Sequence, residues 1–463
     1  MTKLNETRSH DYREILRIAI PLGLANLMLV GNSVVDLLMI GSLGIQEMAG
    51  AILSIQLYLL LVVFGEGVVS AFTPLFSASR GKNNMAEQGR TLLGTIIMSL
   101  IFFAVAAVIM YYSSWLLSAV GVERELTDLA KSYGQVVAFS ILPALISVII
   151  WEIASIHGKS TWVTVSSIIG FLANIVLNWI FILSGWGLPG IALATLLSNC
   201  IVIACILVIM MPTIRELLPY MTRLSEAFAM MPRLIRLGLP IGGIELATVG
   251  FFASTTYLMS FEPSEIIAAH AIAYQVTEFA IVLVLGFGEA ATILVANAFG
   301  AENWPKLRRI SVAITGACLA VALVVCGIMV ALSPWLPSLF VPGEDDVRAT
   351  ISMATTFILI GATFTLLDAL QIAWLGVLRG IQDTMVPMII VMIGYWVIGV
   401  PAGYVLAHKL DIGPTGIWWG LTIGLAFVCF GLALRIWRNM AAIRSRSINM
   451  ASRSSKLINR ELR

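Results

Sequence analysis

The stretches ILRIAIPLGL (residues 15–24) and LIRLGLPIGG (residues 234–243) resemble each other at an offset of 219 residues. Both place an arginine four residues before a proline inside an apolar run. The offset continues downstream without a gap and pairs Arg17 with Arg236, Pro21 with Pro240, Ala49 with Ala268, Gln56 with Gln275, Gly67 with Gly286, Gly81 with Gly300, Asn84 with Asn303 and Arg90 with Arg309. The chain is therefore an internal duplication of one structural unit.

The composition places this duplication in a membrane. Apolar residues make up 59% of the chain, charged residues only 12%, and the mean hydropathy is +0.95, which is outside the range of soluble domains. Runs long enough for a ~30 Å hydrocarbon core predict an all-α protein with twelve spans, near residues 15–40, 49–77, 92–118, 132–156, 162–183, 188–211, 238–259, 266–298, 310–338, 350–378, 385–407 and 412–437.

Other classes of protein are disfavoured by charge and by residue spacing. A net charge of +2 does not suggest a nucleic-acid partner, and all five cysteines lie in apolar runs without metal-ligand spacing. The histidines are scattered along the chain. We expect no cofactor, no zinc site and no enzymatic centre.

Basic residues predict how the chain is oriented. Of the 28 Lys and Arg, 24 fall in the termini and alternate loops of one membrane face, and only Arg124, Lys131, Arg348 and Lys409 lie on the other. By the positive-inside rule both termini are expected in the cytoplasm, which would make this a multi-pass protein of the cytoplasmic (inner) membrane. Because six spans separate the two copies, the repeat is parallel.

Two six-helix lobes with a central cavity follow from a parallel repeat of this kind. We predict an N-terminal lobe (1–210), an amphipathic cytoplasmic linker (211–236), a C-terminal lobe (237–440) and a basic tail (441–463). We expect such a two-lobed chain to function as a monomer.

Seven carboxylates lie inside the spans: Asp36, Glu66, Glu152, Glu245, Glu278, Glu289 and Asp368. Each ionised carboxylate at mid-bilayer costs roughly 2.5–3.5 kcal/mol, so such groups are protonated, bind a cation or face water. Counting ~1.5 Å of rise per residue from the basic face places Asp368, Glu245 and Glu289 near mid-membrane. Asp368 and Gln371 share a helix face, so we interpret them as one arm of a cation or substrate site to which Glu245 and Glu289 also belong. The alternative for each of these carboxyls is a structural role, protonated and satisfied by the backbone of a neighbouring helix.

A second polar group is expected near the outer end of the first lobe. Asp36 and Asn178 each lie nineteen residues beyond a basic residue of the cytoplasmic side, at about 28 Å of depth, and Asn174 shares the helix face of Asn178. One carboxylate and two amides offer oxygen ligands for a hard cation, or a network for a proton.

Three segments, TPLFSASRGKNN, ANAFGAEN and DALQIAWLGVLRG, resemble the multidrug and toxic compound extrusion (MATE) family. The resemblance covers essentially all twelve spans and implies a cation-coupled exporter of organic molecules. It implies functional roles for Asp36 in VVDLLMIG and for Asn174 and Asn178. An Asn at 178 is similar to NorM-type members, whereas DinF-type members usually carry Asp there.

One departure from the family pattern concerns the seventh span. NorM-like members place a glutamate eight residues after the proline of the GLP motif, but here Glu245 follows Pro240 by five and position 248 is Thr248. The role of Glu245 is therefore open. The coupling ion is left open too: H⁺ or Na⁺, with Na⁺ bound by the Asp36 or the Asp368 group.

The sequence thus predicts a secondary active multidrug exporter that antiports mostly cationic, amphipathic, drug-like compounds across the bilayer against H⁺ or Na⁺. Candidate substrate contacts are Trp374, Gln56 and Gln275. A flippase for lipid-linked precursors or a dedicated natural-product exporter of the same superfamily is the alternative. A flippase, however, would be expected to place cationic residues in its cavity to hold pyrophosphate, and the spans offer carboxylates.

Overall fold

The computed structural model describes residues 2–221, 223–340 and 347–461, and it confirms the predicted all-helical membrane fold. The described residues contain no strand. Twelve helical segments among them are long and apolar enough to cross a membrane, as predicted. The chain divides into two compact units, one formed by Leu16–Gly250 and the other by Met1–Ile15 together with Phe251–Arg463.

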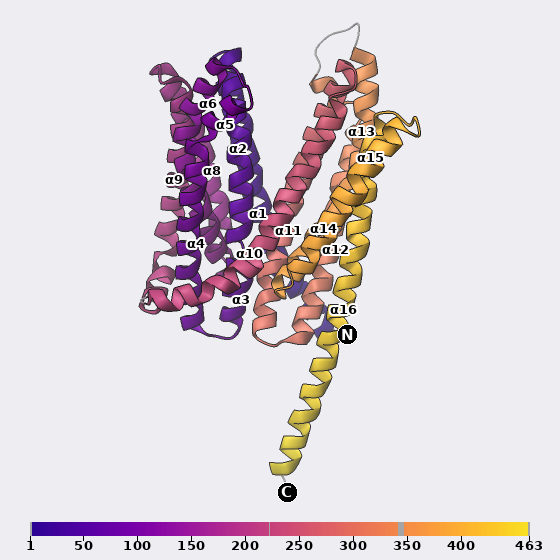
Figure 1. Ribbon diagram of the computed structural model, residues 1–463. Coiled ribbons are helices and arrows are strands. Elements are labelled where there is room, and N and C mark those ends of the chain that lie inside the picture. The colour runs from indigo at the N-terminus through magenta and orange to yellow at the C-terminus, as the bar shows by residue number, and fades with distance from the viewer. Residues whose placement is uncertain (1, 222, 341–346, 462–463) are drawn as a thin grey trace. The chain divides into compact units, whose positions relative to one another are not determined.

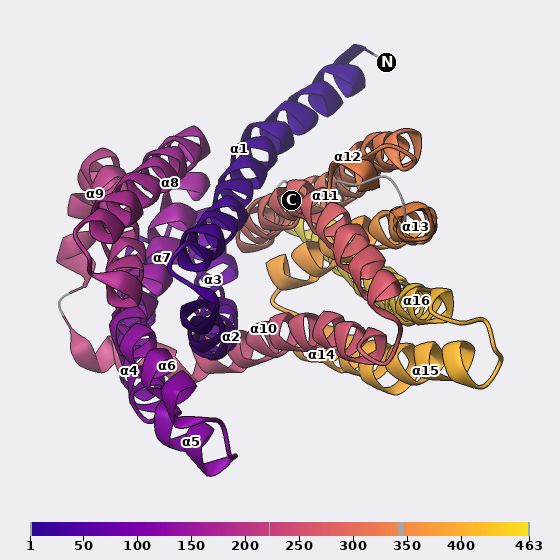
Figure 2. The same ribbon diagram turned by 90° about the horizontal axis from the view of Figure 1, so that it is seen from above.

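The unit Leu16–Gly250 is a bundle in which most helices run side by side in Figure 1, and Figure 2 shows it from above. Its elements are α1 (Thr2–Gly41, from Leu16), α2 (Ile45–Val69), α3 (Phe72–Gly81), α4 (Met85–Tyr111), α5 (Ser113–Ala119), α6 (Arg124–Val137), η1 (Ala138–Ser140), α7 (Ile141–Ile156), α8 (Ser160–Leu183), α9 (Gly187–Leu217), η2 (Leu218–Tyr220) and most of α10 (Leu224–Met259).

The second unit contains the end of α10 and the remaining helices, drawn from rose to yellow in Figure 1. These are α11 (Ser264–Gly300), α12 (Trp304–Leu332), η3 (Leu336–Leu339), α13 (Val347–Gly380), α14 (Met385–Met392), η4 (Ile393–Gly399), α15 (Val400–His408) and α16 (Thr415–Glu461). The segment η4 is a π-helix of 7 residues inside the eleventh span.

The duplication is visible in the backbone of two turns. Asn83 and Glu302, which are 219 residues apart, both adopt positive φ (54° and 52°). The next residue in each copy, Asn84 or Asn303, caps the following helix by accepting a backbone N–H three residues on, at 3.0 and 3.1 Å. The turns end α3 and α11 and begin α4 and α12, so the repeat extends to the hydrogen bonds of the loops.

The second turns of α4 and α12 carry the repeat-related arginines Arg90 and Arg309, and each forms an ion pair. Arg90 pairs with Glu226 at 2.6 Å, and both side chains are partly exposed. Arg309 binds Asp11 through two guanidinium nitrogens, and Asp11 is only 2% exposed. Through this pair the N-terminal residues of α1 belong to the same unit as α12.

The compact units are divided within α1 and within α10, whereas the repeat suggests a lobe boundary at residues 236/237. The stretch predicted as a linker, 211–236, is mostly helical: α9 continues to Leu217, and α10 begins at Leu224. The predicted division into lobes, linker and tail stays a prediction.

Candidate functional site

The helix that carries Asp36 contains a proline whose missing hydrogen bond is replaced. Pro21 lies inside α1 and has no N–H to donate to the carbonyl of Arg17 one turn earlier. The hydroxyl of Ser160, at the start of α8, donates to that carbonyl at 2.8 Å. One turn further along α8, Thr164 donates to the carbonyl of Pro21 at 2.7 Å. These bonds fix α1 against α8, the helix that carries the two predicted asparagines.

The structure brings the three residues predicted in the first lobe together. Asn178 Nδ2 donates to Asp36 Oδ1 at 2.6 Å and to Asn174 Oδ1 at 3.1 Å. Asp36 is 9% exposed, and both asparagines are buried. Counting helix rise from the basic face places Asp36 on α1 and Asn178 on α8 at the same depth, which is why this contact could be predicted.

A fourth member was not predicted. Thr195 on α9 donates to Asp36 Oδ2 at 3.0 Å, so each carboxylate oxygen of Asp36 accepts one hydrogen bond. The same hydroxyl also lies 3.2 Å from the carbonyl of Ile191 in its own helix, so its single hydrogen is shared between the two acceptors; bonding to the helix backbone is common for threonine. For this reason the sequence around Thr195 (ATLLSNC, residues 194–200) did not indicate a contact with Asp36.

Two polar atoms of the Asp36 group take no part in its hydrogen bonds. Asn178 Oδ1 and Asn174 Nδ2 are buried and have no hydrogen-bond partner within the described residues. Neither Lys nor Arg forms an ion pair with Asp36 in that part of the chain. The site therefore holds one carboxylate, two amides and one hydroxyl in an apolar bundle, a set that can exchange a proton or present several oxygens to a hard cation.

A second polar group lies on α13. Asp368 is 7% exposed and Gln371 3%, and the hydroxyl of Tyr395 donates to Gln371 Oε1 at 2.9 Å. The Tyr395 ring stacks on Phe251 with centroids 4.2 Å apart. Tyr395 belongs to the π-helical segment η4, a local widening that is often found at functional sites. In the sequence, Tyr395 is only a tyrosine within an apolar run, so its contact with Gln371 was not predicted.

Two cysteine thiols surround the backbone next to Asp368. Cys318 on α12 donates to the carbonyl of Ala369 at 3.1 Å, and Cys429 on α16 donates to the carbonyl of Leu367 at 3.2 Å. Both thiols lie within Coulombic range of the Asp368 carboxylate. Three helices thus meet around this turn of α13.

Glycines allow α13 to approach α11 closely. A Cβ at Gly376 would come within 2.3 Å of the carbonyl oxygen of Gly288, and Thr292 of α11 donates to the carbonyl of Gly376 at 3.3 Å. Any side chain at Gly376 would push the helices apart. This contact sets the position of Asp368 relative to α11, which carries Glu289.

The other predicted residues lie at several places. Glu245 lies on α10, where its Cγ would be 3.2 Å from a Cβ at Gly67 of α2. Glu289 and Trp374 are half-buried, on α11 and α13. Gln56 on α2 is exposed. Because Glu245 and Asp368 belong to different compact units, their shared role remains a prediction.

Gln275 lines a pocket in the second unit. It lies on α11 with Ala268, Ala271 and Ile272, and Phe340 closes the pocket, whose volume is about 350 Å³. Its amide donates to Glu278 Oε2 at 3.4 Å. Gln275 is thus the candidate substrate contact that faces a measurable cavity.

Only one cluster of acidic and histidine side chains within the described residues has metal-like spacing, and it lies outside the predicted sites. His10, Asp11 and Glu14 at the start of α1 place their ligand atoms within 4.8 Å of one another. Asp11 is bound by Arg309, and Glu14 lies 3.6 Å from Lys306. These carboxylates are neutralised by cationic side chains, so the cluster carries no metal assignment.

Comparison with known proteins places this fold and these residues in a family. The chain matches the sequence family described as MatE over residues 21–180 and 240–405. It is 32% identical over 440 residues to a "Probable multidrug resistance protein NorM" of Bradyrhizobium diazoefficiens, covering 93% of this chain and 94% of that protein. A protein of the same name from Mesorhizobium japonicum is 30% identical over 442 residues, covering 92% and 93%.

A solved structure agrees at the level of the fold. The crystal structure of MATE in the bent conformation aligns with a TM-score of 0.85 at 19% identity, over 95% of this chain and 98% of that one. The two matched sequence segments contain Asp36 and the asparagine pair in the first, and Asp368 with Gln371 in the second. This chain is therefore a multi-pass membrane protein that belongs to the MatE family of transporters.

Proposed function

We propose that this transporter is a secondary active multidrug exporter that exchanges organic, mostly cationic and amphipathic compounds for H⁺ or Na⁺. The observation that carries the proposal is the buried Asp36 group, in which Asn178 and Thr195 hold the carboxylate in an apolar bundle. The NorM relatives, which are named as probable multidrug resistance proteins, support the substrate class.

The hydrogen bonds suggest how cation binding is coupled to a change of state. In the present arrangement the Asn178 amide and the Thr195 hydroxyl face the two Asp36 oxygens. A proton or Na⁺ that binds Asp36 replaces these donors, because N–H and O–H hydrogens do not point at a cation. The unpartnered Asn178 Oδ1 can then turn toward the cation. The exchange changes how α1, α8 and α9 are held together.

Alternating access of two lobes completes the cycle. Cation binding to Asp36 favours one state and the organic substrate favours the other, so each ligand lowers the affinity for its competitor. The Asp368 and Gln371 group is the second arm, which binds substrate or a further cation. Both termini are cytoplasmic in this scheme, the protein lies in the inner membrane, and a monomer carries out transport without a cofactor.

The test is transport in proteoliposomes with one imposed ion gradient at a time. Efflux of an ethidium-like cation should collapse a pH gradient or take up Na⁺, and Asp36→Asn should uncouple the two fluxes. Asp128→Asn is the matched control, because Asp128 is exposed on α6. Efflux that survives dissipation of both gradients and stops when ATP is removed would disprove antiport.

A further inference from the structure

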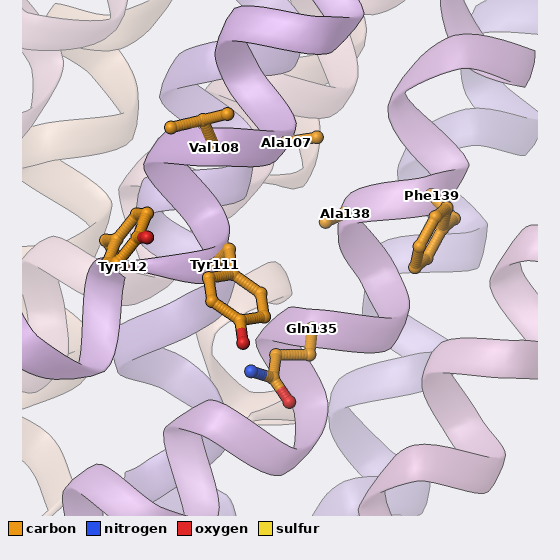
Figure 3. Close-up of a pocket in the computed structure, with 7 residues that line it drawn as sticks. All are labelled: Ala107, Val108, Tyr111, Tyr112, Gln135, Ala138 and Phe139. Atoms are coloured by element: carbon orange, nitrogen blue, oxygen red, sulfur yellow. The ribbon is translucent and has the colours of Figure 1, made fainter.

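A pocket of about 340 Å³ opens on the first unit between α4 and the α6–η1 segment. Figure 3 shows that the Tyr111 hydroxyl and the Gln135 amide lie together at one end of it. Ala107, Val108, Ala138 and Phe139 line the other part, and the Tyr112 ring completes the lining beside Val108. The volume is at the lower end of the ~300–1,000 Å³ range of ligand pockets. The pocket is thus amphipathic along its length.

Two helices independently place its polar end at a membrane boundary. Tyr111 lies 21 residues after Arg90 on α4, which corresponds to about 31 Å of helix rise. Gln135 lies 21 residues before Ile156 along α6, η1 and α7, again about 31 Å. Both distances start from the basic face and match the ~30 Å hydrocarbon thickness. The polar end therefore lies at the opposite interface, and the apolar end points into the hydrocarbon layer.

The polar groups at this end are not used by the protein. Within the described residues, neither the Tyr111 hydroxyl nor the Gln135 amide forms a hydrogen bond. Next to the pocket, α6 packs closely on α2, because a Cβ at Gly134 would come within 2.8 Å of Ser54 Oγ, whose hydroxyl donates to the Ala130 carbonyl.

A cationic side chain lies one turn beyond the polar end. Lys131 is four residues before Gln135 on α6, so it shares the helix face and is displaced outward by about 6 Å. It is exposed and forms no ion pair in the described part of the chain, including with Asp128 on the same helix. Arg124 lies two further turns outward, and the exposed carboxylates Glu123, Glu125 and Asp128 lie in the same stretch, with Asp128 within one turn of Lys131. Charge, amide and apolar groove therefore follow one another in the order of a phosphate, a glycerol ester and an acyl chain.

We propose that this pocket binds one anionic glycerophospholipid. An acyl chain lies against Val108 and Phe139, Gln135 and the Tyr111 hydroxyl bond the ester region, and Lys131 holds the phosphate. If the predicted orientation is correct, the lipid belongs to the outer leaflet. The site does not depend on the transport mechanism proposed above.

The test measures lipid retention on the intact, detergent-purified transporter by mass spectrometry, with added phosphatidylglycerol or phosphatidylcholine. The wild type should retain one phosphatidylglycerol more tightly than phosphatidylcholine. Lys131→Gln should weaken phosphatidylglycerol binding about fivefold, as expected for one cation near a charged lipid, and leave phosphatidylcholine unchanged. Lys409→Gln is the matched control, because Lys409 is also an exposed lysine at the predicted outer face.

A second pair of variants tests the groove separately from the charge. Ala107→Phe fills the pocket and should weaken retention of both lipids. Val105→Phe adds the same ring at an exposed position of α4 that does not line the pocket, and should have no effect. Size-exclusion profiles and thermal unfolding check that each variant is folded. Equal effects within either pair of variants would overturn the proposal.

Discussion

Removing the Ser160 hydroxyl tests whether it replaces the hydrogen bond that Pro21 cannot make. Ser160→Ala leaves the Arg17 carbonyl without its 2.8 Å donor, in a region where Ser160 itself is fully buried. Hydrogen bonds between membrane helices contribute about 0.6 kcal/mol on average and about 1.7 at most. We expect Ser160→Ala to lower the free energy of unfolding by about 1 kcal/mol.

A double-mutant cycle identifies the cause. Pro21→Ala restores an N–H that can donate to the Arg17 carbonyl within α1. In that background Ser160→Ala should cost much less, which gives a coupling energy of roughly 0.5–1 kcal/mol. The assay is unfolding of the purified protein in mixed micelles of increasing denaturing detergent, followed by circular dichroism.

Thr164→Val is the matched control for this cycle. The Pro21 carbonyl that Thr164 contacts has the N–H of Ala25 one helical turn on as its regular partner. Thr164→Val should therefore lower the free energy of unfolding by less than Ser160→Ala does, and by the same amount with proline and with alanine at position 21. The reasoning fails if Ser160→Ala costs the same free energy with proline and with alanine at position 21.

Two further predictions concern the second unit. Gly376→Ala should destabilise the protein by 1–3 kcal/mol, the usual range of overpacking, because its Cβ would overlap the Gly288 carbonyl. Gly327→Ala, inside α12 where a Cβ meets nothing within 4 Å, should not destabilise the protein in the same unfolding assay and should stabilise it by up to about 1 kcal/mol. Asp368→Asn should impair efflux of an organic cation in proteoliposomes far more than Glu278→Gln, and equal tolerance of both would remove Asp368 from the mechanism.

Part of the site could be predicted because depth can be counted along a helix. The distances of Asp36 and Asn178 from their basic residues placed them at one level, and the structure joins them at 2.6 Å. Likewise, the repeat aligned Asn84 with Asn303, and in the structure both residues cap helices. Periodicity and charge fix the level of a residue in the membrane and its helix face.

Contacts between helices could not be predicted, because the sequence does not show which neighbouring helix packs against each helix face. Thr195 and Ser160 are hydroxyl residues in spans, where such side chains usually bond their own backbone, so their contacts with α1 gave no signal. Tyr395 reaches Gln371 from a π-helical turn, and the i+5 register of that turn cannot be read from a pattern with a period of 3.6.

The pair formed by Arg309 and Asp11 has a consequence for synthesis of the chain. The two residues are 298 positions apart, so at ~5–20 residues per second the ribosome makes Arg309 about 15–60 s after Asp11. An unpaired buried carboxylate is strongly unfavourable, which means that the start of α1 cannot adopt its final environment during this interval. Docking of the residues around Asp11 must therefore wait until α12 has emerged, after the 298 residues that separate the pair have been translated.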